Sequence, residues 1–502
     1  MSVTANAATP AGGAPARVLA LCVDAEAACA GGPFAERVAA VRTRLDGPLR
    51  VAIAGRVKAG KSTLLNALVG ERLAPTDAGE CTRIVTWYQQ GTGYDVAARL
   101  RSGERRPLPF RRLDGALDIE LGSVAPHDVE AIDVNWPTSA LARITLIDTP
   151  GLASLNEENS LRTRDFLDHA AGHPSDADAV IYVMKHLHRR DVEFLGSFMD
   201  RSVTGSSPIN AVAVLSRADE IGAGRIDALD SADRIAARYR DDASVQALCA
   251  TVIPLAGLLA ETGLTLREDE YAALRTLAGT DATELDRMLL AADTFCDVSA
   301  SSLTVELRRQ LLDRFGMFGV RFATDQIRSG QVSTASGLAQ LLVERSGLSD
   351  LRRLIDNHFL PRARVLQARS ALVALRALAV DLRSSDPVTS DRIEREAERI
   401  EASATEFAQL RMAHLVLTGA VDVGEGERRE IDGLMFASSA ARAVGVPDGS
   451  TAETITNAAL AGIDRWRGRG SDPLADPALV EVCETAARSY EALFVANAPA
   501  PA

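Results

Sequence analysis

The chain has 502 residues, of which 47% are hydrophobic and 25% charged, and its formal net charge is −13. This composition excludes a mostly disordered protein, because such chains hold too few apolar residues to build a core. The acidic balance argues against general nucleic-acid binding, since the phosphate backbone favours clustered positive charge, so we expect no nucleic-acid partner.

The sequence favours a cytoplasmic protein. It has no run of 18 apolar residues that could form a transmembrane helix, and its first residues lack the basic start and apolar stretch of a secretory signal. The six cysteines are scattered and form no CxxC pair, which indicates free thiols in a reducing compartment rather than a zinc site or a disulfide framework.

The first part of the chain combines strand-like and helical segments. Residues 1–16 are typical of a disordered tail, and residues 17–47 of two helical stretches that join the helical part described below. Five apolar runs predict strands, at Val51–Ala54, Ile84–Tyr88, Ile144–Ile147, Val180–Met184 and Ala211–Leu215. Helical stretches are expected among the later runs, at Asn159–His169, Asp191–Met199 and Ser231–Tyr239. This pattern predicts an α/β domain over residues 48–360, with a mostly parallel sheet covered by helices on both faces.

The second part, residues 361–495, is typical of an elongated all-α bundle that would form a neck and stalk, followed by a disordered tail over 496–502. One helix over Pro361–Leu417 would be about 85 Å long if unbroken, at 1.5 Å per residue, with a hinge near Pro387. Four of its residues recur at intervals of seven and predict a buried seam: Ile393, Ile400, Phe407 and His414. A loop over 418–426 precedes three further helical stretches, near Arg428–Val444, Thr451–Trp466 and Leu479–Leu493.

The most specific motif is Gly55–Ser62, which reads GRVKAGKS and matches GxxxxGK[ST]. It follows an apolar strand and opens a helix, the context in which this pattern is a phosphate-binding P-loop rather than a glycine-rich turn. Glycines let backbone N–H groups face the phosphates, and the helix N-terminus adds positive potential. Lys61 would reach the β- and γ-phosphates, and the Ser62 hydroxyl would bind Mg²⁺. The expected nucleotide-binding residues of this segment are Gly55, Lys58, Ala59, Gly60, Lys61, Ser62 and Thr63.

Two later segments supply candidates for the metal and the γ-phosphate. Asp148 and Gly151, in an Asp-Thr-Pro-Gly sequence, follow a predicted strand, where a carboxylate can make a second Mg²⁺ contact beside a sensor of the γ-phosphate. An ordinary turn is the alternative for this cluster. The segment Leu73–Thr86 lies where a switch loop belongs, and there Thr82 would bind Mg²⁺ and sense the γ-phosphate, with Thr76 as the rival in the same loop.

A candidate base-recognition motif follows the predicted strand Ala211–Leu215. Ser216-Arg217-Ala218-Asp219 departs at two positions from the [NT]KxD pattern of GTPases. Asp219 would accept hydrogen bonds from N1–H and the 2-amino group of guanine, which adenine does not offer, so it argues against an ATPase. The side chain of Arg217 could lie over the purine ring in place of lysine. An ordinary turn is again the alternative.

Lys58 is a third candidate for a catalytic role, beside Lys61 and Thr82. The chain holds only three lysines against 52 arginines, and two of the three lie in the P-loop. A cation at Lys58 could neutralise charge that develops between the β- and γ-phosphates. The alternative is a solvated loop lysine without a role in catalysis.

Taken in order, the segments GRVKAGKSTLLNALVG, CTRIVTW, DTPGL and SRAD resemble the dynamin superfamily of large GTPases, specifically the bacterial dynamin-like proteins. Among these, the sequence is similar to the isoniazid-inducible dynamin-like proteins of mycobacteria. The resemblance covers about residues 50–260, and over the helical remainder it is one of architecture only. It departs from animal dynamins at Arg56-Val57, where those proteins carry the Gln-Ser of a monovalent-cation site.

The resemblance implies an activity and partners. It implies hydrolysis of GTP to GDP with Mg²⁺, stimulated when two heads meet across the nucleotide, and a stalk that couples hydrolysis to membrane remodelling or envelope maintenance. We therefore expect a homodimer formed through the heads, with a second, paired dynamin-like protein as a further partner, peripheral on the inner face of the cell membrane. A GTP-switched scaffold that recruits envelope proteins without deforming lipid is the alternative.

The candidate membrane contact is the loop region 415–424. Its apolar residues, if they lay at the tip of a bundle, would either insert into a bilayer or pack back on the helices. They are Leu415, Val416, Leu417, Val421 and Val423.

Overall fold

The computed structural model describes residues 13–74, 84–113, 116–150, 177–188, 191–192, 195, 210–297, 302–437 and 439–498. The predicted helix Asn159–His169, most of Asp191–Met199, and three candidate site residues lie outside this part of the chain. Those three residues are Thr76, Thr82 and Gly151.

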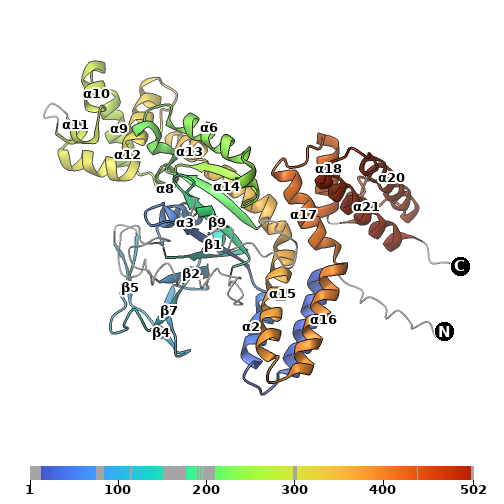
Figure 1. The fold of residues 1–502 in the computed structure, drawn as a ribbon. Coiled ribbons are helices and arrows are strands. Elements are labelled where there is room, and N and C mark those ends of the chain that lie inside the picture. Colours follow the sequence, from blue (N-terminus) through green and yellow to red (C-terminus); the bar gives the residue numbers. More distant parts are fainter. Residues whose placement is uncertain are drawn as a thin grey trace, which may run out of the picture.

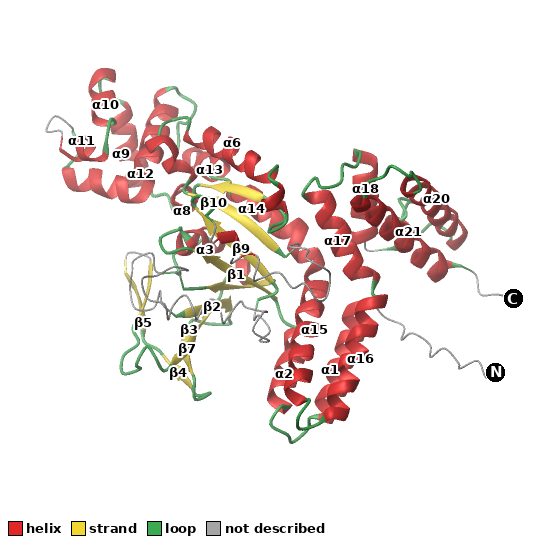
Figure 2. Ribbon diagram, in the orientation of Figure 1, coloured by secondary structure: helices red, strands yellow, loops and turns green. Residues whose placement is uncertain are grey.

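A nine-stranded sheet forms the centre of the first part of the chain, with the order β11-β10-β9-β1-β8-β2-β7-β3-β4 (Figure 2). The predicted α/β class with a mostly parallel sheet is confirmed, since β11, β10, β9, β1 and β8 run parallel to one another, as do β2 and β7. The antiparallel pairs are β2 with β8, β3 with β7, and β3 with β4. The strands are β1 Leu49–Gly55, β2 Val85–Gln90, β3 Asp95–Leu100, β4 Arg105–Pro107, β7 Val129–Trp136, β8 Ile144–Asp148, β9 Ala179–Met184, β10 Ala211–Ser216 and β11 Val252–Leu255, and a separate hairpin pairs β5 Phe110–Leu113 with β6 Ala116–Ile119.

Helices cover both faces of this sheet. Side chains of a strand alternate between the two faces, and on the central strands both sets are apolar, so each face packs against helices. On β1, Val51 and Ile53 pack into one apolar cluster with α3 (Lys61–Val69) and α8 (Gly257–Leu264). Ala52 and Ala54 pack into another with α6 (Ala228–Arg240) and α7 (Ala243–Gln246). The central strands β1, β9 and β10 are apolar almost throughout, as expected for strands buried on both faces.

A helical extension follows α8 at one end of the sheet (Figure 1). It comprises α9 Glu268–Ala278, α10 Ala282–Met288, α11 Ala292–Asp297 and α12 Val305–Arg328, which share an apolar core. The chain then returns along the sheet through α13 (Ala335–Arg345) and α14 (Leu348–Leu354). We call the sheet and these helices, residues 49–354, the head.

Four helices pack side by side at the lower right of Figure 1, beside the sheet, and are called the neck: α1 Ala14–Ala28, α2 Ala35–Arg44, α15 Ala363–Leu382 and α16 Pro387–Ser403. The predicted 85 Å helix is wrong, because the chain reverses between α15 and α16. Ion pairs join Arg383 to Glu394 and Arg376 to Glu401, so the two helices run antiparallel. Pro387 is the first residue of a new helix rather than a hinge in an old one. The Asp386 side chain caps that helix by accepting from Thr389 N at 3.1 Å.

A third group of helices, the C-terminal module, lies beside the upper end of the neck (Figure 1). It comprises α17 Thr405–Leu417, α18 Glu425–Phe436, α19 Ala440–Ala443, α20 Ala452–Gly470 and α21 Pro477–Asn497. The predicted stretch Arg428–Val444 is thus two helices, not one. The four residues of the predicted seam are all buried, but they lie on two helices, Ile393 and Ile400 on α16 and Phe407 and His414 on α17. Among the described residues, none of the helices combines the length and the apolar character needed to cross a membrane.

The loop after α17 does not form a free tip. Val421 and Val423 are only 4% and 5% exposed, and they pack in one cluster with Ile431 and Trp466. Gln246 Nε2 of the head donates to Thr418 O at 2.8 Å, so the loop also touches the head. Of the two alternatives for residues 415–424, packing back on the helices holds for Val416, Val421 and Val423, which are buried, while Leu417 is 39% exposed.

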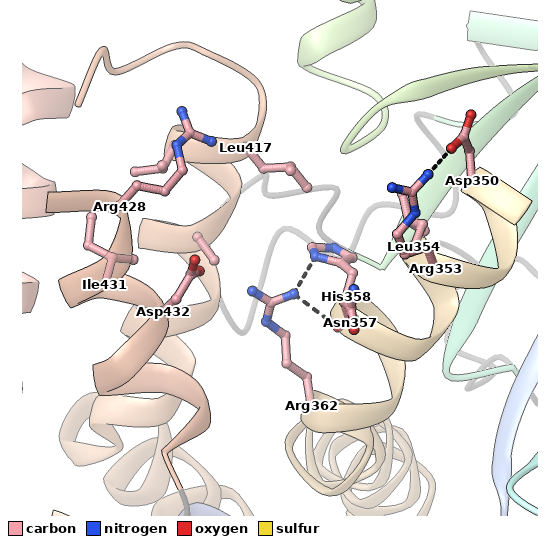
Figure 3. A pocket seen from close by; sticks show the side chains of 12 residues that line it. Asp350, Arg353, Leu354, Asn357, His358, Arg362, Leu417, Arg428, Ile431 and Asp432 are labelled. Atoms are coloured by element: carbon pink, nitrogen blue, oxygen red, sulfur yellow. Dashed lines mark hydrogen bonds and ion pairs between the residues drawn. The ribbon is translucent and has the colours of Figure 1, made fainter. Parts of the chain in front are cut away.

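A cavity of about 510 Å³ lies between the lower end of the head and the C-terminal module (Figure 3). Its two walls face each other in Figure 3: His358 and Arg362 lie on one side, and Ile431 and Asp432 of α18 on the other. Arg362 donates to His358 O at 2.9 Å, and burial lowers its pKa to about 10. Leu417 lines this cavity rather than facing outward from a tip.

A buried ion pair joins neck and head. Arg44, at the end of α2, lies 2.9 Å from Asp178, which precedes β9, and the two side chains are 4% and 0% exposed. Asp178 also accepts from Arg50 N at 3.0 Å. A second contact runs from Gln367 Nε2 of α15 to Gly47 O at 2.9 Å. The position of α2 is therefore fixed to the first residues of β1 and β9.

We expect Arg44→Met to lower the free energy of unfolding by about 3–5 kcal/mol, because it leaves the Asp178 carboxylate buried without its cation. Urea unfolding at neutral pH measures this. The matched control is Arg143→Met, which breaks an ion pair with Asp356 whose side chains are 66% and 58% exposed. That control should cost at most about 1 kcal/mol. Equal losses of unfolding free energy in the two variants would contradict the conclusion that the buried ion pair of Arg44 and Asp178 anchors the neck.

Candidate active site

The P-loop takes its shape from the end of β1. Gly55 has φ +147°, and a Cβ built on it would lie 3.0 Å from the carbonyl carbon of Val183 in β9, and closer still to its oxygen. A side chain does not fit there, so the chain can leave the sheet at this point only with glycine. Lys58 and Gly60 have φ +61° and +98°, which turns the loop back on itself before α3 begins at Lys61. The N-terminus of α3 thus faces the edge of the sheet, where it favours a bound anion.

Lys61 folds over this loop. Its Nζ donates to Gly55 O and to Arg56 O, each at 3.2 Å. Burial lowers the pKa of Lys61, and the nearby Asp148 carboxylate opposes that shift. The ammonium group is therefore placed at the mouth of the P-loop, within reach of an anion that binds there.

The other predicted P-loop residues differ in exposure. Lys58 is exposed, and its ammonium group has no hydrogen bond or ion pair with the residues that the structure describes. Ala59 is buried, and its N–H donates to Arg56 O at 3.2 Å within the turn. Thr63 packs against Gly257, the first residue of α8.

Ser62 and Asp148 form the candidate metal site. The Ser62 hydroxyl donates to Asp148 Oδ2 at 3.2 Å, because β8 lies next to β1 in the sheet. The other carboxylate oxygen, Oδ1, is buried and has no hydrogen-bond partner within the described chain. Burial raises the pKa of Asp148, against the effects of Lys61 and Ser62. A buried carboxylate oxygen without a partner, next to a hydroxyl, fits Mg²⁺, which takes oxygen ligands.

No group of three or more His, Cys, Asp or Glu side chains gathers anywhere in the described ranges. Thr149, which the sequence did not single out, donates from Oγ1 to Ile53 O at 3.0 Å. This hydrogen bond holds the chain just after Asp148 against β1. In the sequence, the only sign of a role for Thr149 was its place next to Asp148.

The candidate base-recognition residues follow β10, two strands away from β1. Ser216 Oγ donates to Met184 O at 3.1 Å, which joins the ends of β10 and β9. Arg217 has φ +54° and pairs with Glu220, which also lies 3.6 Å from Lys185. Asp219 is 6% exposed, and burial raises its pKa to about 6. Its carboxyl group is therefore mostly ionised at neutral pH, and as the pH falls below about 6 one of its two acceptor oxygens becomes protonated.

The sheet brings these groups to one edge. The P-loop, Asp148 and Asp219 all follow the carboxyl ends of parallel strands, which is where open α/β sheets bind ligands. The structure brings Lys61, Ser62 and Asp148 into contact and places Asp219 farther along the same edge. The spacing of the motifs did not reveal two contacts of this site: the ion pair of Glu220 with Arg217, and the hydrogen bond of Thr149 to β1.

Parts of the chain are similar to known proteins. Residues 51–204 match the dynamin family. The isoniazid-induced protein IniC of Mycobacterium tuberculosis (strain ATCC 25618 / H37Rv) is 41% identical over 463 residues, which cover 90% of this chain and 91% of that protein. The bacterial dynamin-like protein of Nostoc punctiforme is 30% identical over 151 residues, 28% of this chain and 20% of that protein.

A solved structure of a bacterial dynamin pair, described as sensing and tethering membranes, aligns with 81% of this chain and 79% of its own. The identity is 14% and the TM-score 0.30, so this likeness carries no argument about assembly or function. The match to IniC extends over nine tenths of both chains. The chain belongs to the bacterial dynamin-like proteins of the dynamin family.

Proposed function

We propose that this protein is a Mg²⁺-dependent GTPase that converts GTP to GDP and phosphate. The observation that carries the proposal is the buried Oδ1 of Asp148, which has no hydrogen-bond partner among the described residues, beside the Ser62 hydroxyl at the mouth of a P-loop. Family membership supports GTP as the nucleotide, and Asp219 supplies the carboxylate that guanine recognition requires.

Each residue has a distinct task in this proposal. Lys61 moves from the carbonyl oxygens of the loop to the β- and γ-phosphates. Ser62 and Asp148 hold Mg²⁺, which supplies positive charge against the phosphate oxygens. Thr82 as a further ligand, and the Gly151 N–H as the sensor of the γ-phosphate, lie outside the described residues. Arg217 lies against the base, and Asp219 accepts from its N1–H and 2-amino group.

The chain lacks the catalytic glutamine that small GTPases carry after the switch glycine, since Leu152 and Ala153 follow Gly151. We therefore propose that two heads meet across the nucleotide and that this homodimer stimulates hydrolysis, as the family resemblance implies. A second, paired dynamin-like protein is a further proposed partner. The neck, tied to β9 through Arg44 and Asp178, would couple the state of the head to membrane remodelling on the inner face of the cell membrane.

Two substitutions separate phosphate binding from base recognition. Lys61→Ala removes the cation at the P-loop and should abolish GTP turnover while the circular dichroism spectrum stays native. Asp219→Asn inverts one donor–acceptor pair, so we expect the preference to shift from guanine to xanthine nucleotides by at least tenfold. Phosphate release from GTP and XTP measures both effects. Native turnover in Lys61→Ala, or an unchanged purine preference in Asp219→Asn, would overturn the assignment.

Lys58 is proposed to act on the rate rather than on binding. Its exposed ammonium group has no partner in the described structure and is free to approach charge between the β- and γ-phosphates. Lys58→Ala should therefore lower kcat about tenfold or more and change nucleotide affinity little. Stopped-flow binding and phosphate release separate the two quantities. An unchanged kcat, or a strict need for K⁺ or Na⁺ in the native protein, contradicts this role.

The membrane contact is proposed for the loop between α20 and α21, because the region 415–424 is packed. Trp466 of α20 is itself buried, and its Nε1 donates to Glu430 at 3.0 Å. Leu474 in this loop is 93% exposed, the largest exposed fraction among the large hydrophobic side chains of the described residues. An apolar side chain held out at a turn between two helices is suited to shallow insertion into a bilayer.

We expect Leu474→Asp to reduce cosedimentation with anionic liposomes at least fivefold and to leave GTP hydrolysis without lipid unchanged. The matched control is Val388→Asp, which adds the same charge at a valine that is 77% exposed on the neck. Equal losses in both variants would exclude a specific contact at Leu474. If the native protein does not cosediment in any nucleotide state, the GTP-switched scaffold becomes the better account.

A further inference from the structure

Helix α12 is interrupted in its middle by a single residue. Gly316 has φ +62° and ψ 173° inside the helix Val305–Arg328. Residues with a side chain rarely adopt this conformation, and it breaks the helical hydrogen-bond ladder at this point. Such a break in an otherwise regular helix of 24 residues needs a local cause.

The interruption faces the candidate base-recognition residue. A Cβ built on Gly316 would lie 3.8 Å from Asp219 Oδ2 and 3.6 Å from Leu258 in α8. The hydroxyl of Thr262, also in α8, donates to Arg314 O just before the break. The kink in α12 therefore lies between the two segments that follow β10 and β11, against the Asp219 carboxylate.

The second half of α12 holds the loop that follows Asp219. Arg321 donates from Nη1 to Ala223 O at 3.0 Å and to Gly224 O at 2.6 Å. Its Nε donates to Leu289 O of the helical extension at 2.9 Å, so one guanidinium joins the two parts. A Cβ on Gly224 would lie 3.3 Å from Phe318 N, which shows how closely α12 approaches this loop.

We propose that the kink of α12 forms a wall of the guanine pocket, and that Gly316 is a specificity-determining position that sets where the Asp219 carboxylate meets the base. This inference rests on the proposed function and adds the helical extension to the base site. Asp219 is almost fully buried, so the groups packed around it decide its orientation. A well-placed carboxylate accepts from both N1–H and the 2-amino group of guanine, but only from N1–H of hypoxanthine, which lacks the amino group.

The test compares the affinities of ribose-labelled GDP and IDP by fluorescence titration. The native protein should favour GDP, and Gly316→Ala should reduce the GDP-to-IDP affinity ratio at least fivefold, chiefly by weakening GDP. The matched control is Gly330→Ala, because Gly330 has φ +74° but no atom within 4 Å of its Cβ position. This control places an alanine at another positive φ, just after the same helix, without touching Asp219, so its ratio should stay native.

A second variant, Arg321→Gln, loosens the loop after Asp219 without adding an atom at the kink. It should reduce the same ratio about twofold to threefold, and it decides the question if Gly316→Ala does not fold. A native ratio in the folded variants, an equal loss of GDP and IDP, or tighter GDP binding in Gly316→Ala would overturn the proposal. If the native protein binds neither nucleotide, the proposed function itself fails. If the native protein binds GDP but the variants keep its GDP-to-IDP affinity ratio, only the proposed role of α12 is wrong.

Discussion

Strand β1 lies between β8 and β9, and its last residue touches the backbone of β9 so closely that no side chain fits. This contact between Gly55 and Val183 excludes a side chain at the point where the chain leaves the sheet for the P-loop. The neighbour on the other side, β8, brings Asp148 to the Ser62 hydroxyl. The residues proposed to bind phosphate and metal are therefore positioned by the pairing of three buried strands, β8, β1 and β9.

The same strand β9 connects this site with the neck. Asp178, just before β9, is buried against Arg44 of α2, and Val183 near the other end of β9 abuts Gly55. A buried ion pair is costly to break, because either partner alone would remain desolvated. The neck is thus anchored to a strand whose far end shapes the P-loop. Gln367 of α15 adds a second attachment to the segment before β1.

Local patterns predicted the elements well where one interaction dominated. The apolar run ending in Gly55, the strand before Asp148, and the heptad spacing of Ile393, Ile400 and Phe407 all predicted structure that the chain adopts. The reversal before Pro387 was not predicted, because a proline after a capping aspartate is compatible with a kink and with a new helix. Only the packing of α16 on α15 decides between them.

Long-range packing was beyond the reach of the sequence patterns. The apolar residues after α17 look the same whether they face lipid or, as here, Ile431 and Trp466. In the candidate site, the spacing of motifs named Ser62, Asp148 and Asp219, but the contacts of Thr149 and the approach of Gly316 to Asp219 depend on how distant segments fold together. Nothing in the sequence around Gly316 indicates that this glycine faces Asp219.

The central claim is that this edge of the sheet hydrolyses a guanine nucleotide with Mg²⁺. The most direct measurement is steady-state phosphate release by the native protein from GTP and from ATP at equal concentrations, with Mg²⁺ and with excess EDTA. We predict turnover of GTP in Mg²⁺, little or none of ATP, and none of either in EDTA. Equal turnover of ATP, or GTP turnover that persists without a divalent cation, would contradict the account.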